Sequence, residues 1–136
     1  MTYLRDSNLS VTLGTTLTGG STQVGEGSGT ASTHINGFIE SVYVKVPAAC
    51  GAGATVLITS SSTSKVILRV TNPSSGGATF YPRKTGHNST ADGTAIGSSA
   101  IGFPIAMLNE RIKATITTSS GAVFRGKVAT IRAIWS

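Results

Sequence analysis

Apolar and polar residues alternate with a period of two in several separate segments of this chain. In residues 37–46, every second residue from Val42 onward is a valine, and residues 65–70 and 111–117 alternate in the same way. Successive side chains of a strand point to opposite faces of its sheet, so this pattern is typical of strands with one buried face. No window has a sustained apolar period of about 3.6 residues, the helical value. The sequence therefore predicts an all-β protein.

Further short strands are predicted between clusters of turn residues, at residues 54–59, 78–81 and 123–135, and residues 104–108 are expected to form a strand or a single turn. About seven to nine strands at this spacing predict a single antiparallel β-sandwich, with a jelly-roll-like arrangement. In the last strand Arg125 and Lys127 share a parity with Ile131 and Trp135. We therefore expect a bulge near Gly126 or a second buried face.

The first quarter of the chain has a different composition. Residues 1–33 contain few candidates for a hydrophobic core and many small polar residues, with one short strand expected at residues 9–13. We expect this segment to form an extended N-terminal arm with a flexible Gly/Ser/Thr-rich part, ordered only against a neighbouring subunit. Residues 34–136 are then expected to form the β-sandwich domain.

Two glycine-containing stretches are interpreted as loops. Gly25, Gly27 and Gly29 lie in a run of small residues with no helix after them, which is typical of a flexible loop. Residues 83–102 are the longest stretch without a clear period, and we expect them to be functional or to include a small strand around Ala95-Ile96.

Positive charge is concentrated in the second half of the chain. The formal net charge is +6, of which residues 1–64 contribute −1 and residues 65–136 contribute +7. Such asymmetry indicates an acidic partner surface, although solvated charges on strands are an equally good interpretation. The residues that we expect to bind a partner are Tyr81, Arg83, Lys84, Arg111, Lys113, Arg125 and Lys127. A nucleic-acid-binding β-module built on these basic residues is therefore one hypothesis for the function.

The chain has few residues of the types that act in catalysis. It has five carboxylates and two histidines, and the pair His87 and Asp92 has neither the spacing of a metal site nor a nucleophile elbow nearby. The stretch from Gly121 to Lys127 matches the start of a phosphate-binding loop motif, but Val128 stands where that motif requires Ser or Thr. We therefore expect no enzymatic activity, no cofactor and no metal site.

The single cysteine, Cys50, excludes an internal disulfide and is expected to be a small buried side chain at a strand end. The first residues lack the apolar run of a signal peptide, and no segment approaches the length of a membrane span. We therefore expect synthesis in a reducing compartment and no contact with a membrane.

Residues 65–136 also carry a set of short motifs. Tyr81-Pro82-Arg83 stands at a predicted strand end and is followed by a polar loop that contains Gly and Asp. Pro104 then precedes the run Leu-Asn-Glu-Arg-Ile-Lys at residues 108–113, and a Gly-containing turn leads into the terminal hairpin. This arrangement resembles a group of small structural proteins of tailed bacteriophages, among them capsid decoration (cement) proteins.

The resemblance implies a β-sandwich or jelly-roll protein of the virion without catalytic residues or cofactors. It implies that the chain is made in the host cytoplasm and then binds and stabilises the major capsid shell. Its partners would be the major capsid protein or other virion proteins, on which it would sit as a homo-oligomer, a trimer or a dimer. A tail, neck or fibre-attachment component is the alternative within the virion.

Overall fold

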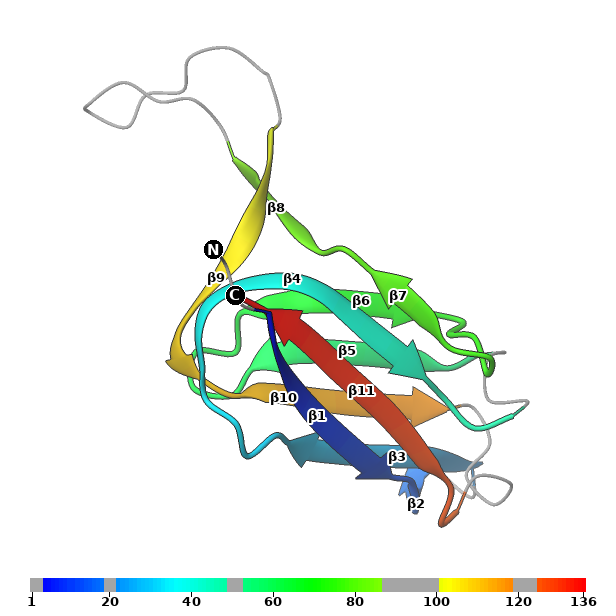
Figure 1. Cartoon of the computed structure of the whole chain (residues 1–136). Helices are drawn as coiled ribbons and strands as arrows, with labels where there is room; N and C mark the ends of the chain where they lie inside the picture. Colours follow the sequence, from blue (N-terminus) through cyan, green and yellow to red (C-terminus); the bar gives the residue numbers. More distant parts are fainter. Residues whose placement is uncertain (1–3, 19–21, 49–52, 87–100, 119–124) are drawn as a thin grey trace.

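The computed structural model describes residues 4–18, 22–48, 53–86, 101–118 and 125–136, and for residues 15–18, 22–24, 84–86 and 101–103 it describes the backbone alone. Every helix or strand within these residues is a β-strand, so the predicted all-β class is confirmed. The strands form two sheets that lie one over the other, and all of their pairings are antiparallel (Figure 1).

The first sheet, sheet A, contains both ends of the described chain. Its strands in spatial order are β1 (Arg5–Thr12), β11 (Val128–Trp135), β4 (Ile35–Lys45), β9 (Ile101–Glu110) and β8 (Arg83–Gly86). The short strand β7 (Ala78–Phe80) also pairs with β4. One edge of β4 is therefore shared, because Ile35 to Ile39 pair with β9 and Val42 to Val44 pair with β7.

The second sheet, sheet B, has five strands. Their spatial order is β2 (Gly14–Thr18), β3 (Thr22–Thr30), β10 (Ile112–Thr118), β5 (Thr55–Ser60) and β6 (Val66–Thr71). The two sheets bury their facing sides in one hydrophobic core, to which β4, β9 and β11 contribute from sheet A and β5, β6 and β10 from sheet B. The arrangement is sandwich-like.

Period-two alternation and the clusters of turn residues together located several strands correctly. The strands predicted at 37–46, 54–59, 65–70, 78–81 and 111–117 correspond to β4, β5, β6, β7 and β10. In β10, for example, Ile112, Ala114 and Ile116 are buried while the residues between them are exposed or half-buried. Burial of one face is what produces this pattern, so sequence and structure agree.

The expected N-terminal arm is not observed, because this segment supplies strands to both sheets. Strand β1 pairs with β11 along its whole length, from Arg5 opposite Trp135 to Thr12 opposite Val128. Its apolar residues point inward, and Val11 and Leu13 are each only 1% exposed. Residues 5–18 and 22–30 therefore belong to the folded body, and the predicted boundary at residue 33 does not separate an arm from a domain.

The glycine-rich stretch is the strand β3, which pairs with β10, and not the flexible loop that its composition suggested. Gly25 and Gly27 are buried, and Gly29 is half-buried, so the glycines occupy the inward face at every second position. A Cβ atom on Gly27 would lie 2.6 Å from the carbonyl oxygen of Thr12 and 2.9 Å from Val11 Cγ1. Glycine is therefore required here because β1 of sheet A approaches β3 closely.

A bulge precedes β11, as the parity of this segment predicted. Gly126 N–H donates to Leu13 O, and Leu13 N–H donates to Lys127 O, each at 2.8 Å. Gly126 and Lys127 therefore both lie opposite the single residue Leu13. Gly126 has a φ of +78°, the conformation of the glycine in this type of bulge. The extra residue resets the alternation, so that Lys127 and Val128 are both exposed before Ala129 is buried.

Part of the predicted irregular stretch is regular. Strand β8 pairs with the first residues of β9, from Arg83 opposite Pro104 to Gly86 opposite Ile101. Only the later part of β9 pairs with β4, so this two-stranded ribbon extends beyond the rest of sheet A (Figure 1). The predictions for Cys50, His87, Asp92, Ala95-Ile96 and Gly121 fall outside the described residues.

Candidate functional site

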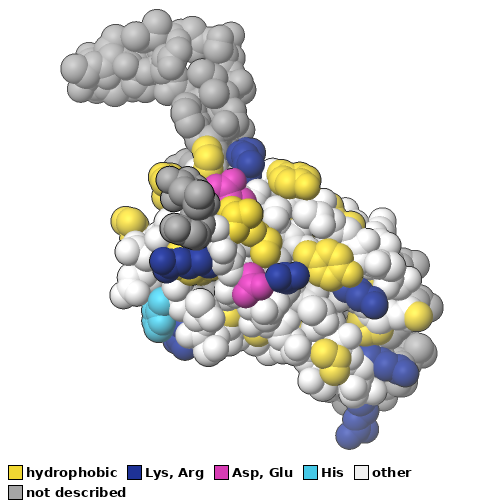
Figure 2. Space-filling view, in the orientation of Figure 1, with side chains coloured by type: hydrophobic (Ala, Val, Ile, Leu, Met, Phe, Trp, Pro, Cys, Tyr) yellow, Lys and Arg dark blue, Asp and Glu magenta, His cyan; other side chains and the backbone are white. Residues whose placement is uncertain are grey.

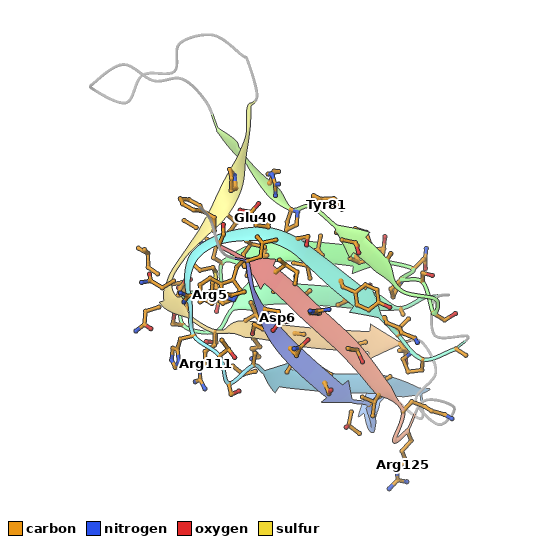
Figure 3. The ribbon with its side chains drawn as sticks, viewed as in Figure 1. Arg5, Asp6, Glu40, Tyr81, Arg111 and Arg125 are labelled. Atoms are coloured by element: carbon orange, nitrogen blue, oxygen red, sulfur yellow. The ribbon has the colours of Figure 1, made fainter. Side chains whose placement is uncertain are left out.

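The residues predicted to bind a partner do not form one patch. Tyr81 follows β7, Arg111 lies at the junction of β9 and β10, and Arg125 lies in the turn before β11; Figure 3 shows these three in separate parts of the molecule. Lys113 is exposed on the side of sheet B that faces away from sheet A. Lys127 is exposed beside the Gly126 bulge. Of Lys84 only the backbone is described. The described basic side chains therefore do not form a continuous track for nucleic acid.

Arg83 has a structural contact of its own. Its Nη1 donates to the carbonyl oxygen of Glu40 at 3.2 Å and to that of Pro82 at 2.8 Å. Glu40 lies on β4 between the residues that pair with β9 and those that pair with β7. The guanidinium therefore supplies a donor to this carbonyl at the point where the strand pairing along β4 is interrupted.

Exposed apolar side chains gather on sheet A. The large hydrophobic residues exposed in the described chain are Leu4, Phe38, Val66, Tyr81, Leu108 and Val128. All of them except Val66 belong to strands of sheet A or directly adjoin one. Leu108 is 79% exposed, Tyr81 69% and Leu4 67%. Exposed apolar side chains indicate a site of contact with another protein where they lie next to one another.

We call the side of sheet A that faces away from sheet B the outer face of sheet A. On this face Phe38 of β4 lies opposite Ala106 of β9, and the neighbouring pair is Asn36 with Leu108. Phe38 and Leu108 are therefore diagonal neighbours on adjacent strands, within reach of each other's side chains. With the exposed Ala106 they form a small apolar patch.

The outer face also carries an ion pair between the edge strand β1 and its neighbour β11. Arg132 Nη2 lies 2.6 Å from Asp6 Oδ2, and both side chains are about half exposed. Two shallow hollows adjoin this pair and share Ser41, Arg132 and Ile134 in their linings. Figure 2 shows this face with yellow hydrophobic side chains spread among white polar ones, and a blue and a magenta side chain side by side. The opposite charges of this pair offset each other, while further blue side chains lie apart from it in the same view (Figure 2).

Tyr43 lies on the same face, between Arg132 of β11 and Thr79 of β7. Its hydroxyl group packs directly over Gly77, where a Cβ atom would overlap the phenol ring. Gly77 has a φ of +86°, so both its backbone conformation and the ring above it require glycine. The turn before β7 therefore holds this aromatic ring in place on the outer face.

A second polar cluster surrounds Glu110 at the end of β9. Its Oε1 accepts hydrogen bonds from the hydroxyl groups of Ser60, Ser62 and Thr63. The hydrogen bond from Ser60 is the largest cause that lowers the pKa of Glu110; burial opposes this effect, and Ser62, Thr63 and the charge of Lys65 support it. The carboxylate is thus held ionised by hydroxyl donors, which is a structural arrangement and not that of a catalytic acid.

The described residues include no group of three or more His, Cys, Asp or Glu side chains placed to hold a metal ion. Within the same part of the chain, no helix is long and apolar enough to cross a membrane. Comparisons with protein-family models, with curated proteins and with solved structures find no match for this chain. The outer face of sheet A therefore has to be interpreted from its own chemistry.

Sequence reasoning did not single out the residues that make up this face. Asp6, Phe38, Tyr43, Leu108 and Arg132 each lie in a segment that alternates, at the positions between core residues. The available signal was the apolar or aromatic character of some of these outward positions, above all Phe38 and Tyr43. Which of them lie side by side depends on strand order and register, and the sequence does not state either.

Proposed function

We propose that this chain is a non-enzymatic structural protein of a tailed-phage virion, a capsid decoration protein that binds the major capsid shell through the outer face of sheet A. The observation that carries the proposal is that five of the six exposed large hydrophobic residues of the described chain lie on or beside strands of sheet A, with Phe38 and Leu108 as neighbours. A surface with aromatic and apolar residues beside a compensated ion pair suits a protein partner. Nucleic acid would instead favour a continuous basic surface.

The order of the strands supports a jelly roll as the finer description of the fold. Without β2, β7 and β8, the described strands are eight: β1, β3, β4, β5, β6, β9, β10 and β11. Along the chain, the first of these pairs with the last, the second with the seventh, the third with the sixth and the fourth with the fifth. These pairs are β1 with β11, β3 with β10, β4 with β9 and β5 with β6. A long antiparallel hairpin rolled into two sheets has this order. Virion proteins are among the proteins that use this fold, which is consistent with the resemblance of residues 65–136 to phage structural proteins.

The ribbon of β8 and the first part of β9 also suits attachment. It extends from the body on the side of Tyr81, and its two strands pair with each other and with no further described strand along that length. A decoration protein occupies many equivalent sites on a shell, so modest contacts at each site act together across the particle. We propose that a homo-oligomer, a trimer or a dimer, brings several outer faces to the capsid at once.

The number of copies per particle tests the proposal. Particles purified from the source of the sequence would be analysed by quantitative mass spectrometry, with the major capsid protein as the internal reference. Hundreds of copies support decoration of the shell. About a dozen copies or fewer would favour a tail, neck or fibre-attachment component, the alternative within the virion. Absence from the particles would overturn the proposal.

Variants then test whether the outer face of sheet A makes the contact. The double variant Phe38→Ser and Leu108→Ser removes two exposed apolar side chains, so we expect the isolated protein to stay folded and its binding to particles stripped of this chain to weaken at least about tenfold. The matched control is Lys113→Ser, on the outer side of sheet B. Equal binding by the double variant, or a larger loss in the control, would count against this face.

A further inference from the structure

The two sheets meet differently along their two sides. On one side β1 packs tightly on β3, where Gly27 and Gly29 leave no room for a side chain. On the other side the structure has a groove between the start of β6 in sheet B and strands β8 and β9 in sheet A. The residues that line this groove are Lys65, Val66, Ile67, Arg83 and Ile105.

Strand β6 borders this groove with a free edge. It pairs with β5 on one side, and no strand of the described chain pairs with its other side. Val66, at its start, is 52% exposed and is the only large exposed hydrophobic residue of sheet B in the described part of the chain. Ile67 and Ile105 are nearly buried, so the groove has an apolar floor beside a row of unpaired backbone groups.

Two cations stand at this groove, and hydrogen bonds to neutral carbonyl groups fix both of them. Lys65 Nζ donates to Ala106 O at 2.6 Å, and Arg83 donates to Glu40 O at 3.2 Å and to Pro82 O at 2.8 Å. None of the described residues that line the groove is a carboxylate. Glu110 and Lys65 both line a separate hollow, and the charge of Lys65 helps to lower the pKa of Glu110.

We propose that this groove binds an extended acidic segment of a partner protein, which adds a strand to the free edge of β6. The backbone of the segment would pair with β6, an apolar side chain would fill the groove, and a carboxylate would lie between Lys65 and Arg83. Alternation of side chains along a strand allows one segment to present both kinds of group. This goes beyond the proposed function, because it assigns a second surface and the chemistry of the segment that it binds.

The other free edges of the described chain fit such a segment less well. Strand β1 lies close against β3, and β7 has only three residues. The hollow beside β1 contains Arg5 and Arg132, but it also contains Asp6, whose carboxylate already pairs with Arg132. Most side chains of the two other edge strands, β2 and β8, are not described. Among the edges whose side chains are described, that of β6 is therefore the one at which pairing, burial and unpaired positive charge act together.

Synthetic hexapeptides test the proposal in the isolated protein. One peptide alternates valine and glutamate, a second alternates valine and lysine, and a third repeats the first with N-methyl groups on every second amide. Titrations would be followed by the amide signals of isotope-labelled protein in NMR. We expect the glutamate peptide to bind in the millimolar range, to shift signals of residues 66–71, and to bind about tenfold more tightly than the lysine peptide.

The N-methylated peptide should bind at least about tenfold more weakly, because it keeps the side chains but loses the edge hydrogen bonds. Lys65→Glu and, independently, Val66→Asp should each weaken the glutamate peptide to the level of the lysine peptide, with the remaining signals showing a folded domain. Absence of binding, equal binding of all peptides, or shifts confined to the outer face of sheet A would overturn the proposal. Because no virion is involved, failure here is distinguishable from failure of the proposed function.

Discussion

The hydroxyl group of Ser60 donates a hydrogen bond of 2.8 Å to the carboxylate of Glu110, which lies 50 residues further along the chain. Ser60 ends β5 of sheet B, and Glu110 ends β9 of sheet A, directly before the chain passes into β10 of sheet B. Asn109 has a φ of +54° at this passage, and Ser61 N–H donates to Arg111 O at 2.8 Å. The Ser60–Glu110 bond therefore fixes the corner at which the chain changes sheets.

Removal of this bond is expected to destabilise the fold. Ser60→Ala leaves one fewer donor on a largely buried carboxylate, so we expect the free energy of unfolding to fall by about 1–2 kcal/mol. Urea unfolding followed by circular dichroism measures the change. Ser10→Ala, an exposed position on β1, is the matched control and should change stability by less than about 0.5 kcal/mol. Equal stabilities of the two variants would contradict a structural role of the bond.

The same cluster predicts a dependence of stability on pH. The pKa of Glu110 is lowered in the folded protein from its ordinary value of 4.5, mainly by the Ser60 hydrogen bond. The ionised group therefore stabilises the fold fully above about pH 4.5, and this contribution is lost as the pH falls through the lower, folded-state pKa. Wild type should exceed Glu110→Gln in stability at about pH 7, and the difference should shrink at about pH 3.

Urea midpoints of the two proteins across this pH range provide the measurement. Glu26→Gln is the control for removal of one negative charge, since Glu26 is exposed on β3. A stability difference between wild type and Glu110→Gln that does not change with pH would show that the carboxylate acts through its shape and not through its charge.

The sequence was most informative where one face of a strand is buried. Ile112, Ala114 and Ile116 alternate because β10 has one face against the core and one in water, and this requirement acts directly on the sequence. Strand β3 was missed because its inward face is made of glycines, which composition alone assigns to loops. The useful signal was their period of two at Gly25, Gly27 and Gly29.

The candidate site could be predicted less well, for a physical reason. Asp6 and Arg132 form an ion pair although 126 residues separate them, because the register of β1 against β11 places them on adjacent strands. Tyr81 was predicted as a surface residue, and its large exposure is consistent with that role. Arg83 was predicted from its charge, but its observed contact is with a backbone carbonyl, which composition does not reveal.

This contact makes Arg83 a second position at which stability can be tested. Arg83→Ala removes the donor that the Glu40 carbonyl receives where the pairing along β4 is interrupted, so we expect a loss of about 1–2 kcal/mol and faster amide exchange in β7 and β8. Arg125→Ala, in the exposed turn before β11, is the control and should change neither the free energy of unfolding nor the amide exchange in β7 and β8. Unchanged exchange in Arg83→Ala would show that the contact does not hold these strands.

Two leucines near the start of the chain test whether this segment is a core element. Leu13 is 1% exposed and Leu4 is 67% exposed. Leu13→Ala is expected to lower the free energy of unfolding by about 2–5 kcal/mol, because it leaves a cavity between the sheets. Leu4→Ala should change it by less than about 0.5 kcal/mol. Deletion of residues 1–33 should abolish the cooperative thermal transition; a stable truncated protein would show that the segment is an arm after all.

The close approach of β1 to β3 gives the last prediction. A methyl group at position 27 would lie 2.6 Å from a backbone carbonyl oxygen of Thr12, which cannot move without displacing β1. Gly27→Ala is therefore expected to lower the free energy of unfolding by about 1–3 kcal/mol, since overpacking forces the sheets apart. Gly14→Ala makes the same chemical change on β2, where the new Cβ atom would lie at an ordinary 3.6 Å from the carbonyl oxygen of Glu26, and it should have little effect on thermal unfolding. If the two alanine variants melt alike, β1 and β3 are not in close contact, and the glycines of β3 need another explanation.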